Sequence, residues 1–324
     1  MSGTRPAEAF PPSGACAPVL AQLGFACNNR CVFCAQGSLR ARTSRSEPTA
    51  VRAALRLAGA DDRRVVAFVG GEPTLDPNLA DYIWEARRLG CARVLLQTNG
   101  RRLAYSAYLR TLRDAGLSAV EISLTGPRAD VHDYHTRVAD SFRQTLAGLR
   151  ESRRAGLPVG LTFVVTRSNY RHLAETVTIA ARIGVQAVHF AGARPRGAAL
   201  TERSRVVPRI EAMADPFARV LEASDAVGIP VLVSGVPLCL VPGLSQRTLE
   251  GLQHRPQSPD ARFADNCRAC ALRERCPGVE PGYAERYGLG ELRPRTAGDR
   301  SHDDAARVAW LFAGLGQTEP QPPW

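Results

Sequence analysis

The sequence predicts an α/β fold in which a parallel sheet precedes a small cysteine-rich unit. Six short apolar runs alternate with amphipathic stretches, which is typical of parallel strands joined by crossover helices. Glycines close to the ends of these stretches fit helix C-termini that lead into the next strand: Gly90, Gly116, Gly156 and Gly184. After residue 228 the alternation stops, and Gly, Pro and Cys dominate. Spacing alone does not separate a doubly wound sheet from a partial barrel.

The elements follow one another at short intervals along the chain. Strands are expected over residues 19–25, 65–69, 93–97, 119–124, 159–165 and 187–190. Helices are expected over residues 47–57, 79–89, 104–115, 141–155 and 173–183, with a longer helical stretch over 206–227. The predicted domains are a flexible leader (1–18), the sheet domain (19–228), the cysteine-rich unit (229–295), and a C-terminal helix with a flexible tail (296–324).

Composition indicates a globular protein of the cytoplasm. The 324 residues are 44% hydrophobic and 23% charged, and no apolar run is long enough to span a membrane. Residues 1–18 lack the apolar segment of a signal peptide. Nine cysteines in such a chain favour metal binding over disulfides. Of these, Cys91 opens an apolar strand and is expected in the core, and Cys16 is expected to be a free thiol.

The net charge of +11 comes from arginine alone, because none of the 42 basic residues is lysine. The arginines are spread along the chain without a long run, which is typical of solvated surfaces. A nucleic-acid partner is therefore not expected. The missing lysine excludes a Schiff-base lysine for pyridoxal phosphate and a P-loop lysine.

Polar residues follow the ends of the predicted strands. Because ligands gather at the carboxyl ends of parallel strands, these residues are expected to meet on one rim. They are Cys27 to Cys34 after the first strand, Gly70 to Thr74 after the second, Thr98 to Gly100 after the third, Ser123 at the end of the fourth, Thr166 and Asn169 after the fifth, and Arg194 after the sixth. His132 and His135 flank Asp133 and Tyr134, which indicates a helix start beside the same rim.

The cysteines of the first strand end have the spacing Cys-x3-Cys-x2-Cys: Cys27, Cys31 and Cys34. Three thiolates can hold a 4Fe–4S cluster and leave one iron without a protein ligand. With Phe33 before the last cysteine and a Gly-Gly-Glu-Pro segment after the second strand, the chain resembles the radical S-adenosylmethionine (SAM) superfamily over about residues 19–200. The resemblance implies a TIM-like partial (β/α)6 barrel that is open on one side.

The resemblance also implies how the site works. SAM would chelate the open iron, and an electron from the cluster would cleave SAM to a 5′-deoxyadenosyl radical that abstracts hydrogen from a substrate. Flavodoxin or ferredoxin would supply the electron. The implied cofactor-binding residues are the segment Gly70, Gly71, Glu72 and Pro73, followed by Ser123, Thr166, Asn169 and Arg194.

Each of these residues has an assigned role and an alternative. Gly70 and Gly71 would let the backbone approach SAM. Glu72 would accept from the SAM ammonium group, or it is an N-cap partner of the next helix. Ser123 is assigned to the ribose or carboxylate, Thr166 or Asn169 to the ribose or adenine, and Arg194 to the SAM carboxylate. Ordinary strand-end roles are the alternative for these four, and a structural zinc site is the alternative for the cysteine triplet.

A second group of cysteines lies in the C-terminal unit: Cys239, Cys267, Cys270 and Cys276. Their spacing resembles the SPASM or twitch extension, which binds auxiliary iron–sulfur clusters. A full SPASM segment would carry another cysteine where this chain has Glu280, so the sequence predicts one auxiliary 4Fe–4S cluster. The cluster is closed if Cys239 ligates it and open to substrate if it does not. A four-cysteine zinc site is the alternative.

The main functional prediction is a radical SAM enzyme that modifies a ribosomal peptide, as SPASM and twitch relatives often do. The alternative is a radical SAM enzyme for a small molecule, such as a cofactor, tetrapyrrole or natural-product precursor. Two other hypotheses have less support. RNA binding is supported by net charge alone, and a non-catalytic zinc protein would leave the rim residues unexplained.

Overall fold

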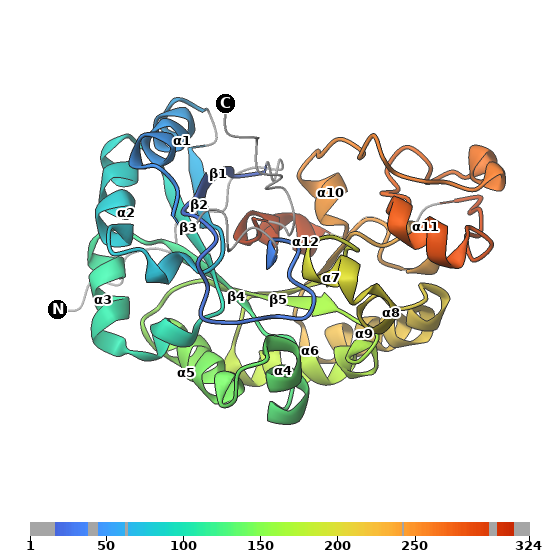
Figure 1. The fold of residues 1–324 in the computed structure, drawn as a ribbon, viewed down its shortest axis with the longest axis horizontal. Helices are drawn as coiled ribbons and strands as arrows, with labels where there is room; N and C mark the ends of the chain where they lie inside the picture. The colour runs from blue at the N-terminus through green and yellow to red at the C-terminus, as the bar shows by residue number, and fades with distance from the viewer. Residues whose placement is uncertain (1–16, 38–44, 62–63, 242, 298–302, 314–324) are drawn as a thin grey trace.

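The computed structural model describes residues 17–37, 45–61, 64–241, 243–297 and 303–313. Its centre is a parallel seven-stranded sheet whose strands lie side by side in the order of the sequence. The strands are β1 Val19–Gln22, β2 Val65–Val69, β3 Arg93–Thr98, β4 Ala119–Ser123, β5 Val159–Val165, β6 Ala187–Gly192 and β7 Val231–Ser234. Since β1 and β7 are its two edges, the sheet forms an open partial barrel (Figure 1).

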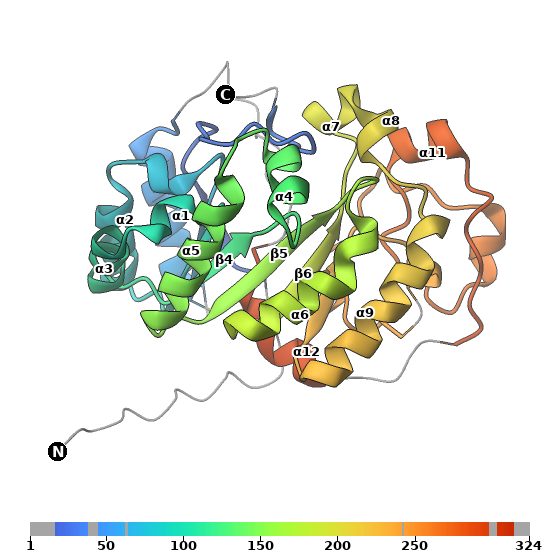
Figure 2. The ribbon, with the colours of Figure 1, turned by 90° about the horizontal axis from the view of Figure 1, so that it is seen from below.

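Helices follow most of the strands. In chain order they are α1 Pro48–Ala60, α2 Leu79–Arg88, α3 Ser106–Asp114, α4 Ala129–Thr136, α5 Ser141–Arg154, α6 Leu173–Ile183, α7 Ala198–Thr201, α8 Arg203–Val206, α9 Ala214–Val227, α10 Leu249–Leu252, α11 Pro281–Tyr287 and α12 Asp303–Val308. Short 3-10 turns lie at residues 73–75, 101–104, 170–172, 211–213, 238–240, 265–269 and 309–311. Helices α1, α2, α3, α5, α6 and α9 cover the outer face of the sheet (Figures 1 and 2).

The outer face carries the main hydrophobic core. Alternate residues of each strand, such as Phe68, Phe163 and Phe190, are fully buried between the sheet and these helices. The rings of Phe163 and Phe190 pack edge to face with centroids 5.6 Å apart. These large side chains point outward from the barrel, so they do not fill its interior.

The inner face of the sheet is covered by residues 303–313, which we call the inner segment. Its Leu311 and Phe312 pack on the small inner residues Ala119, Gly160 and Ala187. A Cβ at Gly160 would lie 2.8 Å from the Phe312 ring, so the ring occupies the space that a side chain would need. The inner segment therefore fills the interior at the amino ends of the strands (Figure 2).

Buried polar groups fasten the inner segment. The Glu121 carboxylate in β4 accepts a hydrogen bond from Thr162 Oγ1 at 2.6 Å and from the backbone N–H of Ala313 at 2.7 Å. Gln253 Nε2 donates to the carbonyls of Ala309 and Phe312 at 2.9 and 2.8 Å. Burial raises the pKa of Glu121, and the hydrogen bonds from Thr162 and Ala313 oppose this rise. The segment is thus held by specific bonds as well as by apolar contact.

Replacing Gly160 with valine is expected to lower the free energy of unfolding by roughly 2–3 kcal/mol, because a branched side chain overlaps the buried Phe312 ring. Urea denaturation measures this. Gly290→Ala is the matched control, since nothing lies within 4 Å of a Cβ there, and it is expected to stay within about 0.5 kcal/mol of wild type. Equal unfolding midpoints for Gly160→Val and wild type would contradict the packing described.

The structure confirms the predicted α/β partial barrel, with one strand more than the six expected. Strand β7 lies beyond the predicted boundary at residue 229, where Gly and Pro obscured a four-residue strand. The stretch 206–227 is not one helix: α8 ends at Val206, Pro208 lies two residues further on, and α9 begins only at Ala214. The domain boundaries themselves stay a prediction, and most of the predicted leader and tail lies outside the described residues.

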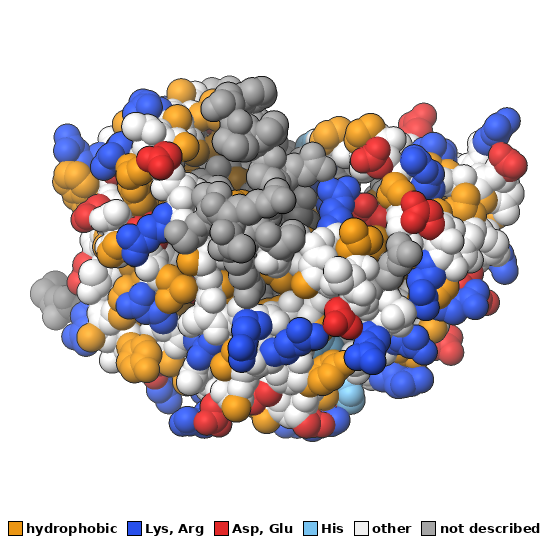
Figure 3. Space-filling view, viewed as in Figure 1, with side chains coloured by type: hydrophobic (Ala, Val, Ile, Leu, Met, Phe, Trp, Pro, Cys, Tyr) orange, Lys and Arg blue, Asp and Glu red, His pale blue; other side chains and the backbone are white. Residues whose placement is uncertain are grey.

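Charged side chains are distributed over many elements. On the face shown in Figure 3, arginines lie among acidic and apolar side chains rather than in one continuous patch. None of the helices in the described ranges combines the length and the apolar character that crossing a membrane requires.

Candidate functional site

The cysteine loop, residues 23–37, leaves the carboxyl end of β1 and carries Cys27, Cys31 and Cys34, all partly exposed. Its backbone pairs with the segment after β2: the N–H of Gly71 donates to Gly24 O at 2.9 Å, and the N–H of Glu72 donates to Ala26 O at 2.7 Å. The two rim segments that the sequence places after the first two strands are therefore hydrogen-bonded to each other.

Gly70 and Gly71 allow the segment after β2 to lie close to the backbone of the cysteine loop. A Cβ on Gly71 would lie 2.2 Å from Ala26 O and 2.4 Å from Phe25 O, so any side chain would push the cysteine loop away. Gly70 has a φ of +140°, and its Cβ would lie 2.4 Å from Gly24 O. The sequence-based interpretation assigned both glycines to SAM contact, whereas their close neighbours here belong to the cysteine loop.

Glu72 is buried and its carboxylate accepts four hydrogen bonds. Oε1 accepts from the N–H and the hydroxyl of Thr74, at 3.1 and 2.6 Å, and from the Thr98 hydroxyl at 2.6 Å. Oε2 accepts from the N–H of Asn99 at 2.8 Å. Oε1 thus takes three of these bonds and Oε2 one, and an ionised carboxylate offers about two lone-pair sites on each oxygen. Glu72 thus caps the turn at residues 73–75, as in the N-cap alternative, and joins the ends of β2 and β3, while its role toward the SAM ammonium group stays a prediction.

Residues after β3 hold the turn between Cys27 and Cys31. Arg101 Nη1 donates to Asn28 O at 2.6 Å and to Asn29 Oδ1 at 2.8 Å. Asn99 Nδ2 donates to Asn28 Oδ1 at 2.6 Å. The sequence analysis did not identify Arg101, although its position directly after the Thr-Asn-Gly strand end is the signal that could have found it. The cysteine loop is thus fixed from β2 and β3 together.

The remaining predicted SAM-binding residues differ in where they lie. Ser123 is half-buried at the end of β4, on the same face as Glu121. Thr166 and Asn169 are fully buried, and Asn169 Oδ1 accepts from the N–H of Thr166 at 2.7 Å. Arg194 lies 3.7 Å from Glu280, so it faces the C-terminal unit. Pro73 is buried in the first turn after Glu72.

The four cysteines of the C-terminal unit line one small apolar pocket: Cys239, Cys267, Cys270 and Cys276. Backbone N–H groups point at two of the sulfurs, from Arg293 to Cys239 Sγ at 3.5 Å and from Arg295 to Cys270 Sγ at 3.3 Å. Burial raises the pKa of the Cys239 and Cys276 thiols, and backbone hydrogen bonds oppose the rise in both. The structure brings the predicted second set together.

The described ranges of the chain hold no group of side chains suited to a single metal ion. Within those ranges, no three His, Cys, Asp or Glu side chains lie close enough together to hold one metal ion. A 4Fe–4S cluster spaces its cysteine ligands more widely, because each sulfur binds a different iron.

Residues 22–180 match the family model described as the Radical SAM superfamily. A probable GTP 3′,8-cyclase of Metallosphaera sedula is 31% identical over 177 residues, which are 54% of this chain and 55% of that protein. An AdoMet-dependent heme synthase of Methanosarcina barkeri is 28% identical over 173 residues, which are 52% of this chain and 48% of that protein. The chain therefore spans about half the length of these curated relatives.

The fold is also similar to that of SuiB from Streptococcus suis bound to S-adenosylmethionine. The TM-score is 0.59 at 14% identity, over 86% of this chain and 77% of SuiB, so this likeness concerns the fold alone. The superfamily match and the enzyme names of the relatives support an enzyme, with SAM and a 4Fe–4S cluster as its cofactors. The chain thus carries, in residues 22–180, a domain of the radical SAM superfamily.

Proposed function

We propose that this chain is a radical SAM enzyme whose cluster is held by Cys27, Cys31 and Cys34. The observation that carries the proposal is the position of these cysteines on one loop at the carboxyl end of β1, docked on the Gly70–Gly71 turn. A bound 4Fe–4S cluster with SAM would supply a radical able to remove hydrogen from an unreactive carbon.

The donor set fits such a cluster. The three thiols are partly exposed at the loop surface, and the N–H of Asn29 points at Cys27 Sγ at 3.4 Å, as suits a sulfur that carries negative charge. The loop is held by backbone bonds to β2 and by Arg101, so its shape is set before any cofactor binds. In this proposal Glu72 holds the ends of β2 and β3 together, and Ser123, which is half-buried at the end of β4, contacts SAM on the inner face of the sheet.

We also propose one auxiliary 4Fe–4S cluster in the C-terminal unit. The support is that Cys239 lies in the same pocket as Cys267, Cys270 and Cys276, with N–H groups directed at two sulfurs. Four cysteines match the ligand number of a closed cluster, which transfers electrons and does not bind substrate through iron.

The double variant Cys267→Ala/Cys270→Ala is expected to lower the iron content from about eight to about four per chain, because it removes half of the auxiliary ligands. Iron and zinc analysis of anaerobically purified protein measures this. A wild type with about four irons and one zinc would instead support the zinc alternative, and eight irons retained in the double variant would contradict both.

For the substrate we propose a small molecule rather than a peptide. The support is the pair of relatives named GTP 3′,8-cyclase and AdoMet-dependent heme synthase, which match about half of this chain. They favour the small-molecule alternative over the ribosomal peptide, which was the main prediction from the sequence and stays untested. An external one-electron donor of the flavodoxin or ferredoxin type is part of the proposal.

Anaerobic incubation with SAM, a reductant and one candidate at a time tests the substrate. The candidates are GTP, a tetrapyrrole precursor of haem, and a synthetic peptide, and 5′-deoxyadenosine is counted per altered product molecule. A mass change in a small molecule with matching 5′-deoxyadenosine is the expected result. A mass change confined to the peptide would overturn the small-molecule proposal while leaving radical SAM chemistry in place.

A further inference from the structure

Helix α4 contacts the cysteine loop through the carbonyls of its last turn. The N–H of Val32 donates to His135 O at 3.0 Å, and the N–H of Arg30 donates to Thr136 O at 2.9 Å. Carbonyls in the last turn of a helix have no partner within the helix, so outside donors must satisfy them. Here the donors come from the residues between Cys27 and Cys34. The cysteine loop and the end of α4 therefore stabilise each other.

The His135 ring fastens this end of α4 to the barrel. His135 is fully buried, with Nδ1 2.6 Å from Val131 O and Nε2 2.7 Å from the Thr166 hydroxyl. Since a carbonyl only accepts, Nδ1 must carry the proton and Nε2 must accept from Thr166. The ring also lies against Phe33, with centroids 6.2 Å apart. One residue thus joins the loop, through its backbone and ring, to the end of β5.

Thr166 is itself rigidly placed. Its N–H donates to Asn169 Oδ1, and Asn169 Nδ2 donates to Thr125 O at 3.0 Å and Val164 O at 2.9 Å. All of these groups are buried, where lost hydrogen bonds carry the full desolvation penalty. The sequence-based interpretation placed Thr166 and Asn169 against SAM. Here they form the base on which His135 rests.

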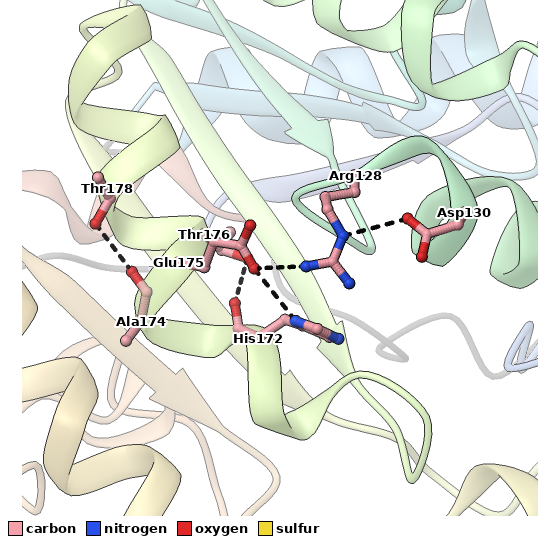
Figure 4. A network of polar contacts seen from close by, with 7 residues as sticks. All are labelled: Arg128, Asp130, His172, Ala174, Glu175, Thr176 and Thr178. Atoms are coloured by element: carbon pink, nitrogen blue, oxygen red, sulfur yellow. Dashed lines mark hydrogen bonds and ion pairs between the residues drawn. The ribbon is translucent and has the colours of Figure 1, made fainter.

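Ion pairs lie at the surface of the opposite end of α4. Arg128 lies 3.4 Å from Asp130 and 3.3 Å from Glu175 of α6, and Glu175 also meets His172 (Figure 4). Exposed ion pairs of this kind contribute little. The junction with α5 is stronger, because the Asp133 carboxylate accepts from the N–H groups of Asp140 and Phe142 at 2.8 and 2.7 Å. The C-terminal half of α4 is therefore also tied to α5.

We infer that His135 is a positioning residue for the iron–sulfur cluster, acting through the cysteine loop and not by touching the cluster or SAM. This rests on the proposed function of Cys27, Cys31 and Cys34. Loss of the Thr166 bond loosens the end of α4, although Asp133 still ties it to α5, and the N–H groups of Arg30 and Val32 then meet acceptors that are held less firmly. The loop then holds Cys31 and Cys34 less firmly, so the cluster and its open iron shift relative to the glycine segment.

The test compares His135→Phe with His132→Phe. His132 is equally buried on the same helix and also makes a buried hydrogen bond, accepting from the N–H of Thr125 at 3.1 Å. Its ring packs against Phe142 of α5, and neither Thr125 nor Phe142 belongs to the cysteine loop. His135→Gln is the rescue variant, because a glutamine amide can restore the bond with Thr166. Thr166→Val removes the same bond from the other side.

Two measurements are made on each variant. In cluster-free protein, hydrogen exchange at the amides of Arg30 and Val32 is expected to accelerate at least tenfold in His135→Phe and Thr166→Val. In reconstituted protein, the electron paramagnetic resonance change on SAM addition is expected to need at least fivefold more SAM. His132→Phe and His135→Gln are expected to stay within twofold of wild type in both measurements.

The outcomes separate the two proposals. A wild type with no spectral response to SAM would reject the proposed function, whereas the exchange measurement would still test the link between His135 and the loop. Unchanged exchange in His135→Phe would overturn the inference. Equal effects of His135→Phe and His132→Phe would overturn it as well, because they would reflect lost stability alone.

Discussion

Replacing Cys31 with alanine is expected to abolish the reductive cleavage of SAM, by about a thousandfold or more, equivalent to about 4 kcal/mol of the activation barrier. Cys31 is the middle cysteine of the loop, and its carbonyl accepts from the N–H of Cys34 at 3.2 Å. Two thiolates cannot hold the three irons that this site must ligate. Chromatographic detection of 5′-deoxyadenosine after anaerobic reduction measures the loss, and iron analysis should show about four irons fewer per chain.

Cys91→Ala is the matched control for this substitution. Cys91 is buried two residues before β3 and belongs to the main hydrophobic core, as the sequence predicts. Its loss is expected to lower stability slightly and to leave iron content and SAM cleavage unchanged. Cleavage at the wild-type rate in Cys31→Ala, or equal losses in both variants, would remove the basis for the proposed cluster.

The second large effect is expected at Glu72. Changing it to glutamine is expected to lower the free energy of unfolding by about 2–4 kcal/mol, because an amide nitrogen would face at least one of the buried donors that the carboxylate now accepts. Either the N–H of Asn99 or the group around Thr74 and Thr98 would lose its acceptor. Denaturation of the cluster-free protein in urea measures this without any contribution from cofactors.

Glu85→Gln carries the same chemical change at the surface. Glu85 pairs with Arg52 at 3.1 Å, and both side chains are partly exposed, so the expected change is within about 0.5 kcal/mol. A similar small change for Glu72→Gln would show that the carboxylate is not needed to join β2 and β3. A role as acceptor for the SAM ammonium group would then regain support.

The fold could be predicted because its strands are almost entirely apolar. Strands β2 and β5 agree residue for residue with the expected runs, and helix α6 begins and ends where periodicity placed it. Strand β7 has four residues and follows a Pro, so its local pattern was too short to stand out. The inner segment could not be predicted, because its partners Gly160 and Glu121 lie more than 140 residues away in the sequence.

For the candidate site, the sequence predicted which residues lie at the rim, whereas their contacts within the chain became visible only in the structure. The resemblance to the SPASM or twitch extension grouped Cys239 with the other three cysteines, and the four line one pocket. The roles of Thr166 and Arg194 depended on direction, which a sequence does not carry: Thr166 points to His135 and Arg194 to Glu280. Strand-end position therefore predicted that these residues lie at the rim, but not which groups they contact.

The inner segment also bears on how the chain folds as it is made. Ribosomes release the chain from its N-terminus, so all seven strands emerge before residues 303–313 exist. Until then the Glu121 carboxylate lacks the N–H of Ala313, and the surface around Ala119 and Gly160 has no apolar cover. The barrel interior therefore stays partly hydrated and open to chaperones until residues 303–313 have been made and have packed into it.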